Sequence, residues 1–277
     1  MNSTRSETYL TFPIRSDKLT MTVKVTETLC HRKTAFQTID ILQTDAFGRI
    51  LLLDEHIQLA ELDEHAYHEA LVHIPLLSVA KPRRALVVGG GDGGVLRELV
   101  KHPTMEQIDM VDIDGGVVEE SRRHLPFVSD GAFDDPRVNL TFGDAFPYVK
   151  QDRPAYDLII VDATDTYEEE DGEISAALFT DEFYADCKRL LAPGGFVVTQ
   201  ADNLLFCPYS LDEIMANFGR TFAHVGSYWA MVPSFGGFSG YCWAGQEPLV
   251  PNWHQPEFSC RYLSELTYRL AFQPLPF

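Results

Sequence analysis

Residues 85–98 read Ala85-Leu86-Val87-Val88-Gly89-Gly90-Gly91-Asp92-Gly93-Gly94-Val95-Leu96-Arg97-Glu98. The apolar run predicts a buried strand, the glycines a sharp turn, and the residues after them the start of a helix. Glycines let the backbone approach a ligand, and the amides of the helix start point into the same pocket. These amides suit a phosphate or carboxylate, but Asp92 adds negative charge inside the turn. The turn therefore favours a ligand with a cationic group.

The chain on both sides of this turn alternates between strand and helix patterns, which predicts a doubly wound, mostly parallel, Rossmann-like α/β sheet. An antiparallel hairpin, with strands at 224–231 and 240–244, is expected at its edge. We expect strands at 85–88, 107–111, 138–142, 156–161 and 195–199, and helices at 93–101, 115–124 and 180–191.

The segment before residue 63 has a different pattern. Short alternating runs separated by turn signals at 45–48 and 54–55 predict a small antiparallel β domain. Asp63 then stands where it can cap a helix that runs to Pro75. We therefore expect two domains, an N-terminal β-strand domain (1–62) and a Rossmann-like catalytic domain (63–277).

Composition narrows the function classes. The 277 residues are 45% hydrophobic and carry a formal net charge of −19, which argues against nucleic acid as a partner and favours small cations. No apolar run is long enough for a membrane span or forms a signal peptide core, so we expect no membrane partner and a cytoplasmic location. The five cysteines have no C-x-x-C spacing and are expected to be reduced, mostly buried thiols.

Carboxylates follow four successive predicted strands: Asp92, Asp112, Asp144 and Asp162. Each alone is equally typical of a helix cap or a turn, but ligands of open α/β sheets bind at this edge, and all four together indicate a site. Asp112 is spaced to accept hydrogen bonds from ribose hydroxyls, and Asp144 with Ala145 can meet an adenine. A dinucleotide is disfavoured because Asp92 would face its pyrophosphate. An adenosyl sulfonium fits better.

With these residues placed, the chain closely resembles the polyamine aminopropyltransferases, the spermidine synthase family, over nearly its whole length. The matching segments are Ala46-Phe47-Gly48-Arg49, Gln58, Glu61-Leu62-Asp63-Glu64, Tyr67-His68-Glu69, His73-Ile74-Pro75-Leu76, the glycine turn through Glu98, Asp134-Asp135-Pro136-Arg137, Tyr156 to Asp165, Leu178-Phe179, Phe183-Tyr184 and Cys260-Arg261-Tyr262.

This resemblance implies a class I methyltransferase-type fold and a transferase of polyamine biosynthesis. It would move the aminopropyl group of decarboxylated S-adenosylmethionine, a co-substrate and not a tightly bound cofactor, to a diamine and release 5′-methylthioadenosine. Putrescine giving spermidine is the expected reaction, and agmatine or spermidine are alternative acceptors. The resemblance also implies a homodimer and no metal.

The resemblance also assigns residue roles. The donor is expected to contact Gln37, Gly89, Gly91, Asp112, Asp144 and Ala145, with Asp92 at its propylamine end. The acceptor is expected to contact Tyr67, His68, Asp92, Asp162, Asp165, Gln200 and Phe235. Asp162 is the expected catalytic base, assisted by Tyr67 and Asp165.

The chemistry independently requires such groups. An alkyl ammonium with a pKa near that of lysine, about 10.4, must lose a proton before it can attack, which costs roughly 4 to 5 kcal/mol at pH 7. A carboxylate such as Asp162 can orient the amine and accept that proton, and Tyr67 can align the nitrogen. Because the thioether leaves as a neutral group, alignment matters more than acid assistance.

Three alternatives stay open from the sequence. A methyltransferase would use intact S-adenosylmethionine, whose carboxylate Asp92 would repel. A catalytically silent polyamine-binding subunit is disfavoured by the intact Asp162, Asp165 and Tyr67. His65, His68, Glu69 and His73 have a spacing that could bind a metal on one helix, although the family requires none.

The chain departs from the family pattern at two places that concern the acceptor. Thr166 replaces the usual proline, and the acidic segment 166–177 is longer than usual. It either recognises a more charged acceptor or forms a solvated lid. Phe235 stands where the family often has tyrosine, so the choice of amine is expected to differ.

Overall fold

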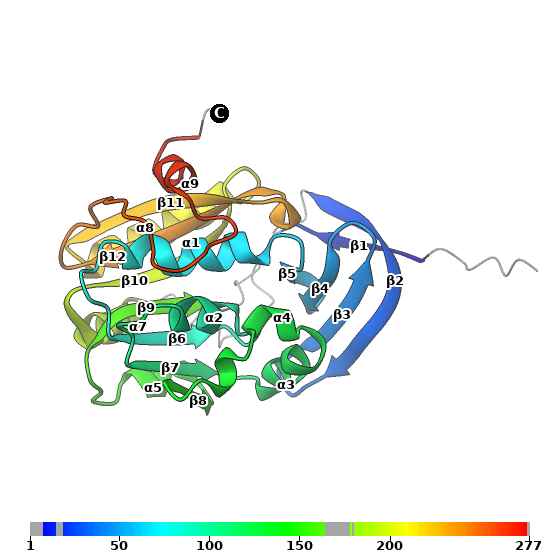
Figure 1. The fold of residues 1–277 in the computed structure, drawn as a ribbon, viewed down its shortest axis with the longest axis horizontal. Helices are drawn as coiled ribbons and strands as arrows, with labels where there is room; N and C mark the ends of the chain where they lie inside the picture. The colour runs from blue at the N-terminus through cyan, green and yellow to red at the C-terminus, as the bar shows by residue number, and fades with distance from the viewer. Residues whose placement is uncertain (1–7, 15–18, 164–177, 179, 276–277) are drawn as a thin grey trace, which may run out of the picture.

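The computed structural model describes residues 8–14, 19–163, 178 and 180–275 and contains two sheets (Figure 1). The N-terminal sheet has five antiparallel strands in the order β1-β2-β3-β4-β5. These are β1 (Thr8–Pro13), β2 (Thr20–Lys33), β3 (Thr38–Thr44), β4 (Gly48–Leu53) and β5 (His56–Ala60). The turn at 45–48 ends with Gly48 at φ +70°, and Asp54 and Glu55 form the next turn with positive φ, so both predicted turns are confirmed.

The larger sheet has seven strands in the order β11-β12-β10-β9-β6-β7-β8. They are β6 (Arg84–Gly89), β7 (Gln107–Asp112), β8 (Val138–Phe142), β9 (Tyr156–Asp162), β10 (Leu191–Asn203), β11 (His224–Val232) and β12 (Gly237–Gly245). The five strands from β6 to β10 pair in parallel, and the hairpin of β11 and β12 joins β10 antiparallel. The chain order reverses on either side of β6, and ligands of such sheets bind at this reversal.

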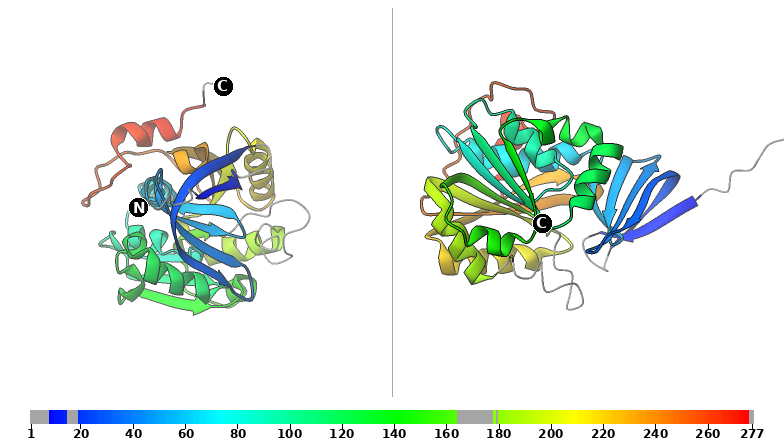
Figure 2. Two further views of the ribbon diagram at one scale, coloured as in Figure 1. Left: turned by 90° about the vertical axis from the view of Figure 1, so that its right-hand side faces the viewer. Right: turned by 90° about the horizontal axis from the view of Figure 1, so that it is seen from below.

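Helices cover both faces of the larger sheet, which makes three layers (Figure 2). They are α1 (Glu64–Leu76), α2 (Gly94–Val100), α3 (Gly115–His124), α4 (Pro126–Ser129), α5 (Ala145–Val149), α7 (Asp181–Leu190), α8 (Pro208–Thr221) and α9 (Glu265–Ala271), with 3₁₀ turns η1 (Ala132–Asp134) and η2 (Pro233–Phe235). Successive β6 side chains show why both faces are covered. Val87 belongs to the core beneath α1 and α2, whereas Leu86 belongs to the core beneath α5, α7 and α8.

The N-terminal sheet packs against the larger unit through two apolar clusters. Phe12 and Ile50 belong to the same buried cluster as Leu71 of α1. A second cluster joins Ile39 of β3 to Val117 of α3. These contacts place the N-terminal sheet beside the carboxyl ends of β6 and β7.

The predicted α/β architecture, with its added hairpin and separate N-terminal sheet, is confirmed. The prediction that Asp63 caps α1 is wrong. Its carboxylate instead accepts hydrogen bonds from the Ser234 amide and hydroxyl, both at 2.7 Å, so it ties the start of α1 to η2. Among the described residues, no helix is long and apolar enough to cross a membrane. All five cysteines are free thiols.

Candidate active site

A cavity of about 420 Å³ opens at the carboxyl ends of the parallel strands, beside the N-terminal sheet. Its volume falls in the range of small-molecule sites. Ten of the predicted site residues line it: Gln37, Tyr67, Gly89, Gly91, Asp92, Asp112, Asp144, Ala145, Asp162 and Gln200. Asp165 and the acidic segment 166–177 lie outside the described residues. His68 and Phe235 lie behind the lining.

The glycine turn is bound tightly to the neighbouring strand in the sheet, β9. The Gly90 amide donates to the Asp162 carbonyl at 2.9 Å. Gly89 has φ +81°, and a Cβ there would lie 2.2 Å from that same carbonyl oxygen. Only glycine fits this position, because both the backbone conformation and the close approach exclude a side chain. This contact therefore holds the turn, which contains Asp92, against the end of β9, where Asp162 lies.

Asp92 lies between the glycine turn and a buried histidine. Its Oδ1 accepts the Gly94 amide at 2.6 Å and lies 3.4 Å from Nε2 of His68. The His68 side chain is 1% exposed, and its Nδ1 lies 2.8 Å from Glu64 Oε2. A Cβ on Gly94 would overlap the imidazole at 2.2 Å, so the turn must have glycine there as well. His68 thus supports Asp92 from below.

Charge in this group is balanced. Burial lowers the pKa of His68, but Asp92 and Glu64 outweigh it and raise that pKa to about 10, so the ring is an imidazolium at neutral pH. Burial raises the pKa of Asp92, and His68 overrides it so that the net direction is down. Arg97 completes the network with two hydrogen bonds to Glu64, at 2.9 and 3.0 Å. From the sequence, Arg97 received no role and Glu64 was placed at the entrance for the acceptor. The buried contact of Glu64 with His68 was not predicted, although their i, i+4 spacing was available as a signal.

Asp112 and Gln37 meet at the start of α3. Asp112 accepts the Asp114 amide at 2.8 Å, and the Gln37 side chain donates to Asp114 at 3.1 Å. Burial raises the pKa of Asp112 to about 6, and the Asp114, Asp162 and Asp92 carboxylates add to the effect. Hydroxyl donors from a ligand would relieve this cost by stabilising the ionised form.

Asp144 caps a helix and also faces the cavity, so its position is compatible with both of the interpretations that the sequence left open. Its side chain accepts the Phe146 amide at 2.8 Å and so caps α5, and it also lines the cavity next to Ala145. The cap orients the carboxylate, and a carboxylate has acceptor sites beyond the one that the cap uses.

Tyr67 and Asp162 meet at one side of the cavity. The Tyr67 hydroxyl donates to Asp162 Oδ1 at 2.6 Å. Phe235 packs edge-on against the Tyr67 ring, with centroids 5.5 Å apart, and its carbonyl accepts the Asn203 side chain at 2.6 Å. Phe235 is 2% exposed and therefore acts on the cavity through Tyr67. Gln200 lines the cavity from β10 and accepts the Asp202 amide at 3.0 Å.

Three of the four helical residues weighed as a metal site, His68, Glu69 and His73, turn to different partners. His68 pairs with Glu64, and His73 lies 2.7 Å from Glu98. Glu69 accepts the backbone amides of residues 261, 262 and 263, which docks the segment at Cys260-Arg261-Tyr262 on α1. These three residues therefore make separate structural contacts and do not face one common metal position.

A cavity at the strand reversal, lined by carboxylates after four parallel strands, is typical of α/β enzymes that act on small molecules. The comparisons narrow this class. The model of the spermine/spermidine synthase domain matches residues 64–252, and that of the spermidine synthase tetramerisation domain matches residues 11–61. The chain belongs to the spermine/spermidine synthase family, and it is an aminopropyltransferase-type enzyme.

Individual relatives agree with this family. The chain is 37% identical to the polyamine aminopropyltransferase of Moorella thermoacetica, over 95% of this chain and 93% of the relative. It is 41% identical to that of Pyrobaculum calidifontis, over 80% and 76%. A spermidine synthase in complex with the transition state analogue AdoDATO superposes with a TM-score of 0.90 at 26% identity, over 98% and 93%. The Thermotoga maritima spermidine synthase gives 0.87 at 25%, over 98% and 92%.

Proposed function

We propose that this enzyme transfers the aminopropyl group of decarboxylated S-adenosylmethionine to putrescine and forms spermidine and 5′-methylthioadenosine. The observation that carries the proposal is the placement of Asp92, Asp112, Asp144 and Asp162 around one cavity. Asp112 and Asp144 suit the ribose and adenine of the donor, and Asp92 suits its terminal ammonium. Gln37 and the glycine turn complete the donor side.

The acceptor amine would lie between Asp162 and the aminopropyl carbon of the donor. Asp162 takes a proton from the ammonium, and the freed lone pair forms the new C–N bond. The C–S bond breaks with its electron pair going to sulfur, which leaves as a neutral thioether. Tyr67 donates to Oδ1 of Asp162 and so orients this carboxylate for the amine. The net reaction releases one proton, which passes through Asp162 to solvent.

Alignment supplies most of the expected rate enhancement, because the leaving group needs no protonation. Gln200 lines the acceptor end, whereas His68 and Phe235 position Asp92 and Tyr67 from behind. Asp165 is proposed to assist Asp162, on the strength of the family resemblance alone. The extra acids of 166–177 leave agmatine and spermidine as alternative acceptors.

Release of 5′-methylthioadenosine, measured on a panel of amines, tests this function. We expect release with putrescine and decarboxylated donor, and tighter binding of that donor than of intact S-adenosylmethionine. Faster turnover of agmatine or spermidine would correct the acceptor and leave the reaction class intact. Tighter binding of intact S-adenosylmethionine, or no release with any amine, would refute the proposed reaction.

The N-terminal sheet is proposed to join subunits. The matched model over residues 11–61 is described as a tetramerisation domain, and the family resemblance implies a homodimer. Light scattering on the eluting protein separates these states by mass. We expect the mass of a dimer, and the mass of a tetramer would overturn this expectation.

A further inference from the structure

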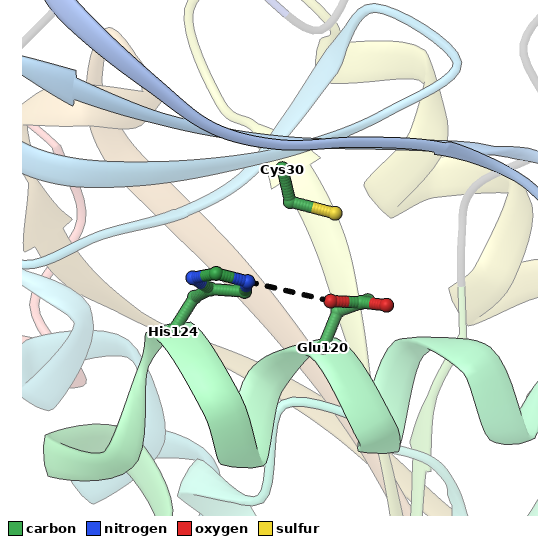
Figure 3. Close-up of side chains that lie close together, drawn as sticks. All are labelled: Cys30, Glu120 and His124. Carbon is green, nitrogen blue, oxygen red and sulfur yellow. Dashed lines mark ion pairs between the residues drawn. The ribbon is translucent and has the colours of Figure 1, made fainter.

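A group of side chains that could bind a metal ion lies where the N-terminal sheet meets α3, apart from the catalytic cavity. It consists of Cys30 on β2 and of Glu120 and His124 on α3. Figure 3 shows the Cys30 side chain extending from its strand toward the two helical side chains. None of these three residues lines the catalytic cavity. The group therefore has no part in the proposed transfer.

The geometry of this group suits a small cation. One ligand atom from each residue lies within 4.8 Å of the other two. Around tetrahedral zinc, with bonds of about 2.0 to 2.3 Å, ligand atoms lie roughly 3.3 to 3.8 Å apart. The His124–Glu120 separation of 3.5 Å already falls in this range, and the upper limit of 4.8 Å exceeds it by only about 1 Å. Glu120 and His124 are spaced i, i+4, so they share one helix face.

Within the group, Cys30 hydrogen-bonds to Glu120, whereas the contact of His124 with Glu120 is long. Nε2 of His124 lies 3.5 Å from Oε2 of Glu120, which is too long for a strong hydrogen bond. Arg32 binds the other Glu120 oxygen, Oε1, at 2.7 Å. Oε2 is thus turned toward the imidazole and the thiol while Arg32 orients the carboxylate. An outer partner of this kind is typical of metal ligands.

We propose that Cys30, Glu120 and His124 form a binding site for a zinc-class divalent cation that joins the N-terminal sheet to α3. One sulfur, one nitrogen and one oxygen ligand suit a borderline metal such as Zn²⁺ better than Mg²⁺ or Ca²⁺, which prefer oxygen alone. Water would fill the fourth position. His124 retains 20% exposure and gives the ion a path from solvent.

Binding replaces the thiol proton of Cys30, because the thiolate is the ligand. Glu119, beside Glu120 on α3, adds negative charge near the ion, and it pairs with Arg32 at 2.8 Å. The cation would fix β2 against the helix whose first residues carry the Asp112–Asp114 contact. Occupancy is therefore expected to raise the melting temperature of the whole chain.

Cobalt titration of the metal-free full-length protein tests the site. We expect one equivalent of Co²⁺ to give a thiolate-to-cobalt charge-transfer band, which Zn²⁺ then removes. Loss of an outer partner already weakens metal sites about 10- to 100-fold, so Cys30→Ser and His124→Gln should weaken binding at least about tenfold. Cys260→Ser, which alters another partly buried thiol, is the matched control and should bind like the wild type.

Two outcomes overturn the proposal. One is a cobalt spectrum without a thiolate band, which would place the ion elsewhere, for example at His68, Asp92 and Asp162. The other is unchanged affinity in both variants. Metal-free melting curves show whether each variant is folded. If Cys30→Ser does not fold, His124→Gln still tests the site, because it retains the thiol. The measurement needs neither donor nor amine, so its outcome is independent of the transfer assay.

Discussion

The hydroxyl of Tyr67 donates a 2.6 Å hydrogen bond to the carboxylate of Asp162, across 95 residues of sequence. Tyr67 is on α1 and Asp162 ends β9, so the contact forms only when the helix packs on the sheet. A short bond to a carboxylate fixes one of its oxygens and directs the other. In the proposed reaction, the pair would set the direction in which Asp162 takes a proton from the acceptor.

Tyr67→Phe should lower kcat/KM for the amine by about 10- to 100-fold, because a hydrogen bond to a charged group contributes about 1.5 to 3 kcal/mol. Tyr156→Phe is the matched control, since its hydroxyl also donates to a carboxylate, Asp109, at 2.6 Å. It should lower stability and spare turnover. Steady-state kinetics with varied amine measure both, and equal losses in the two variants would remove Tyr67 from the site.

Asp162→Asn should lower kcat by about 10² to 10⁴, because the amide cannot accept the ammonium proton. The KM for the donor should change little, since the adenosine contacts are elsewhere. Asp152→Asn, at a fully exposed carboxylate near Arg189, is the control and should turn over normally. Methylthioadenosine release under saturating substrates gives kcat directly. Unchanged turnover in Asp162→Asn would exclude its role as base.

The fold was accessible from the sequence because its signals are local. The strand at 138–142 is found with its predicted bounds, since a short β-rich run ends at clear turn residues. Helix α8 was not predicted, although its apolar residues Ile214 and Phe218 have helical spacing. It lies in the chain between β10 and the hairpin, both of which have strong strand patterns.

The site was accessible in part for the same reason. Parallel strands end at one edge, so Asp92, Asp112, Asp144 and Asp162 could be grouped without knowing their contacts. The supporting contacts could not be found in this way. The Asp63 contact with Ser234 spans 171 residues and depends on how α1 docks on η2. Local pattern gives Asp63 a cap role, and tertiary packing overrides it.

His68→Gln should destabilise the protein by about 3 to 5 kcal/mol at neutral pH, because Asp92 and Glu64 lose their buried counter-ion. The pKa of His68 is raised from 6.5 to about 10. Its contribution to stability is therefore complete below about pH 6.5 and is lost as the pH rises through about 10. Melting temperatures across this interval should fall for the wild type and stay flatter for the variant.

The control for this variant is His31→Gln. His31 also lies beside a carboxylate, Asp40 at 2.7 Å, but its side chain is 70% exposed. Exposed pairs contribute little, so its melting curve should follow the wild type at each pH. If the melting temperatures of His68→Gln and of the wild type changed in parallel with pH, the imidazolium of His68 would not be what stabilises this network.

Donor affinity should fall as the pH decreases through about 6, the raised pKa of Asp112. Ribose hydroxyls donate to the ionised carboxylate, so protonation removes the acceptor they need. Asp112→Asn should weaken donor binding about 10- to 100-fold and abolish this pH dependence. Asp112→Glu should retain both the donor affinity and its pH dependence, because it keeps the charge. Calorimetric titration with 5′-methylthioadenosine between pH 5 and 8 measures them, and a pH-independent wild type would contradict the assignment.

Gly89→Ala should destabilise the enzyme by about 2 to 4 kcal/mol, because the alanine must adopt φ +81° and its Cβ would lie 2.2 Å from the Asp162 carbonyl. Relief of that overlap must move β9 or the glycine turn, so turnover should fall as well. Gly219→Ala is the control: in the part of the chain that the structure describes, no atom outside its own helix backbone and chain neighbours lies within 4 Å of the new Cβ, and alanine favours helix α8. Denaturant unfolding should show Gly219→Ala at or above wild-type stability. If Gly89→Ala matched it in both stability and turnover, the close contact between the turn and Asp162 would have no role in shaping the site.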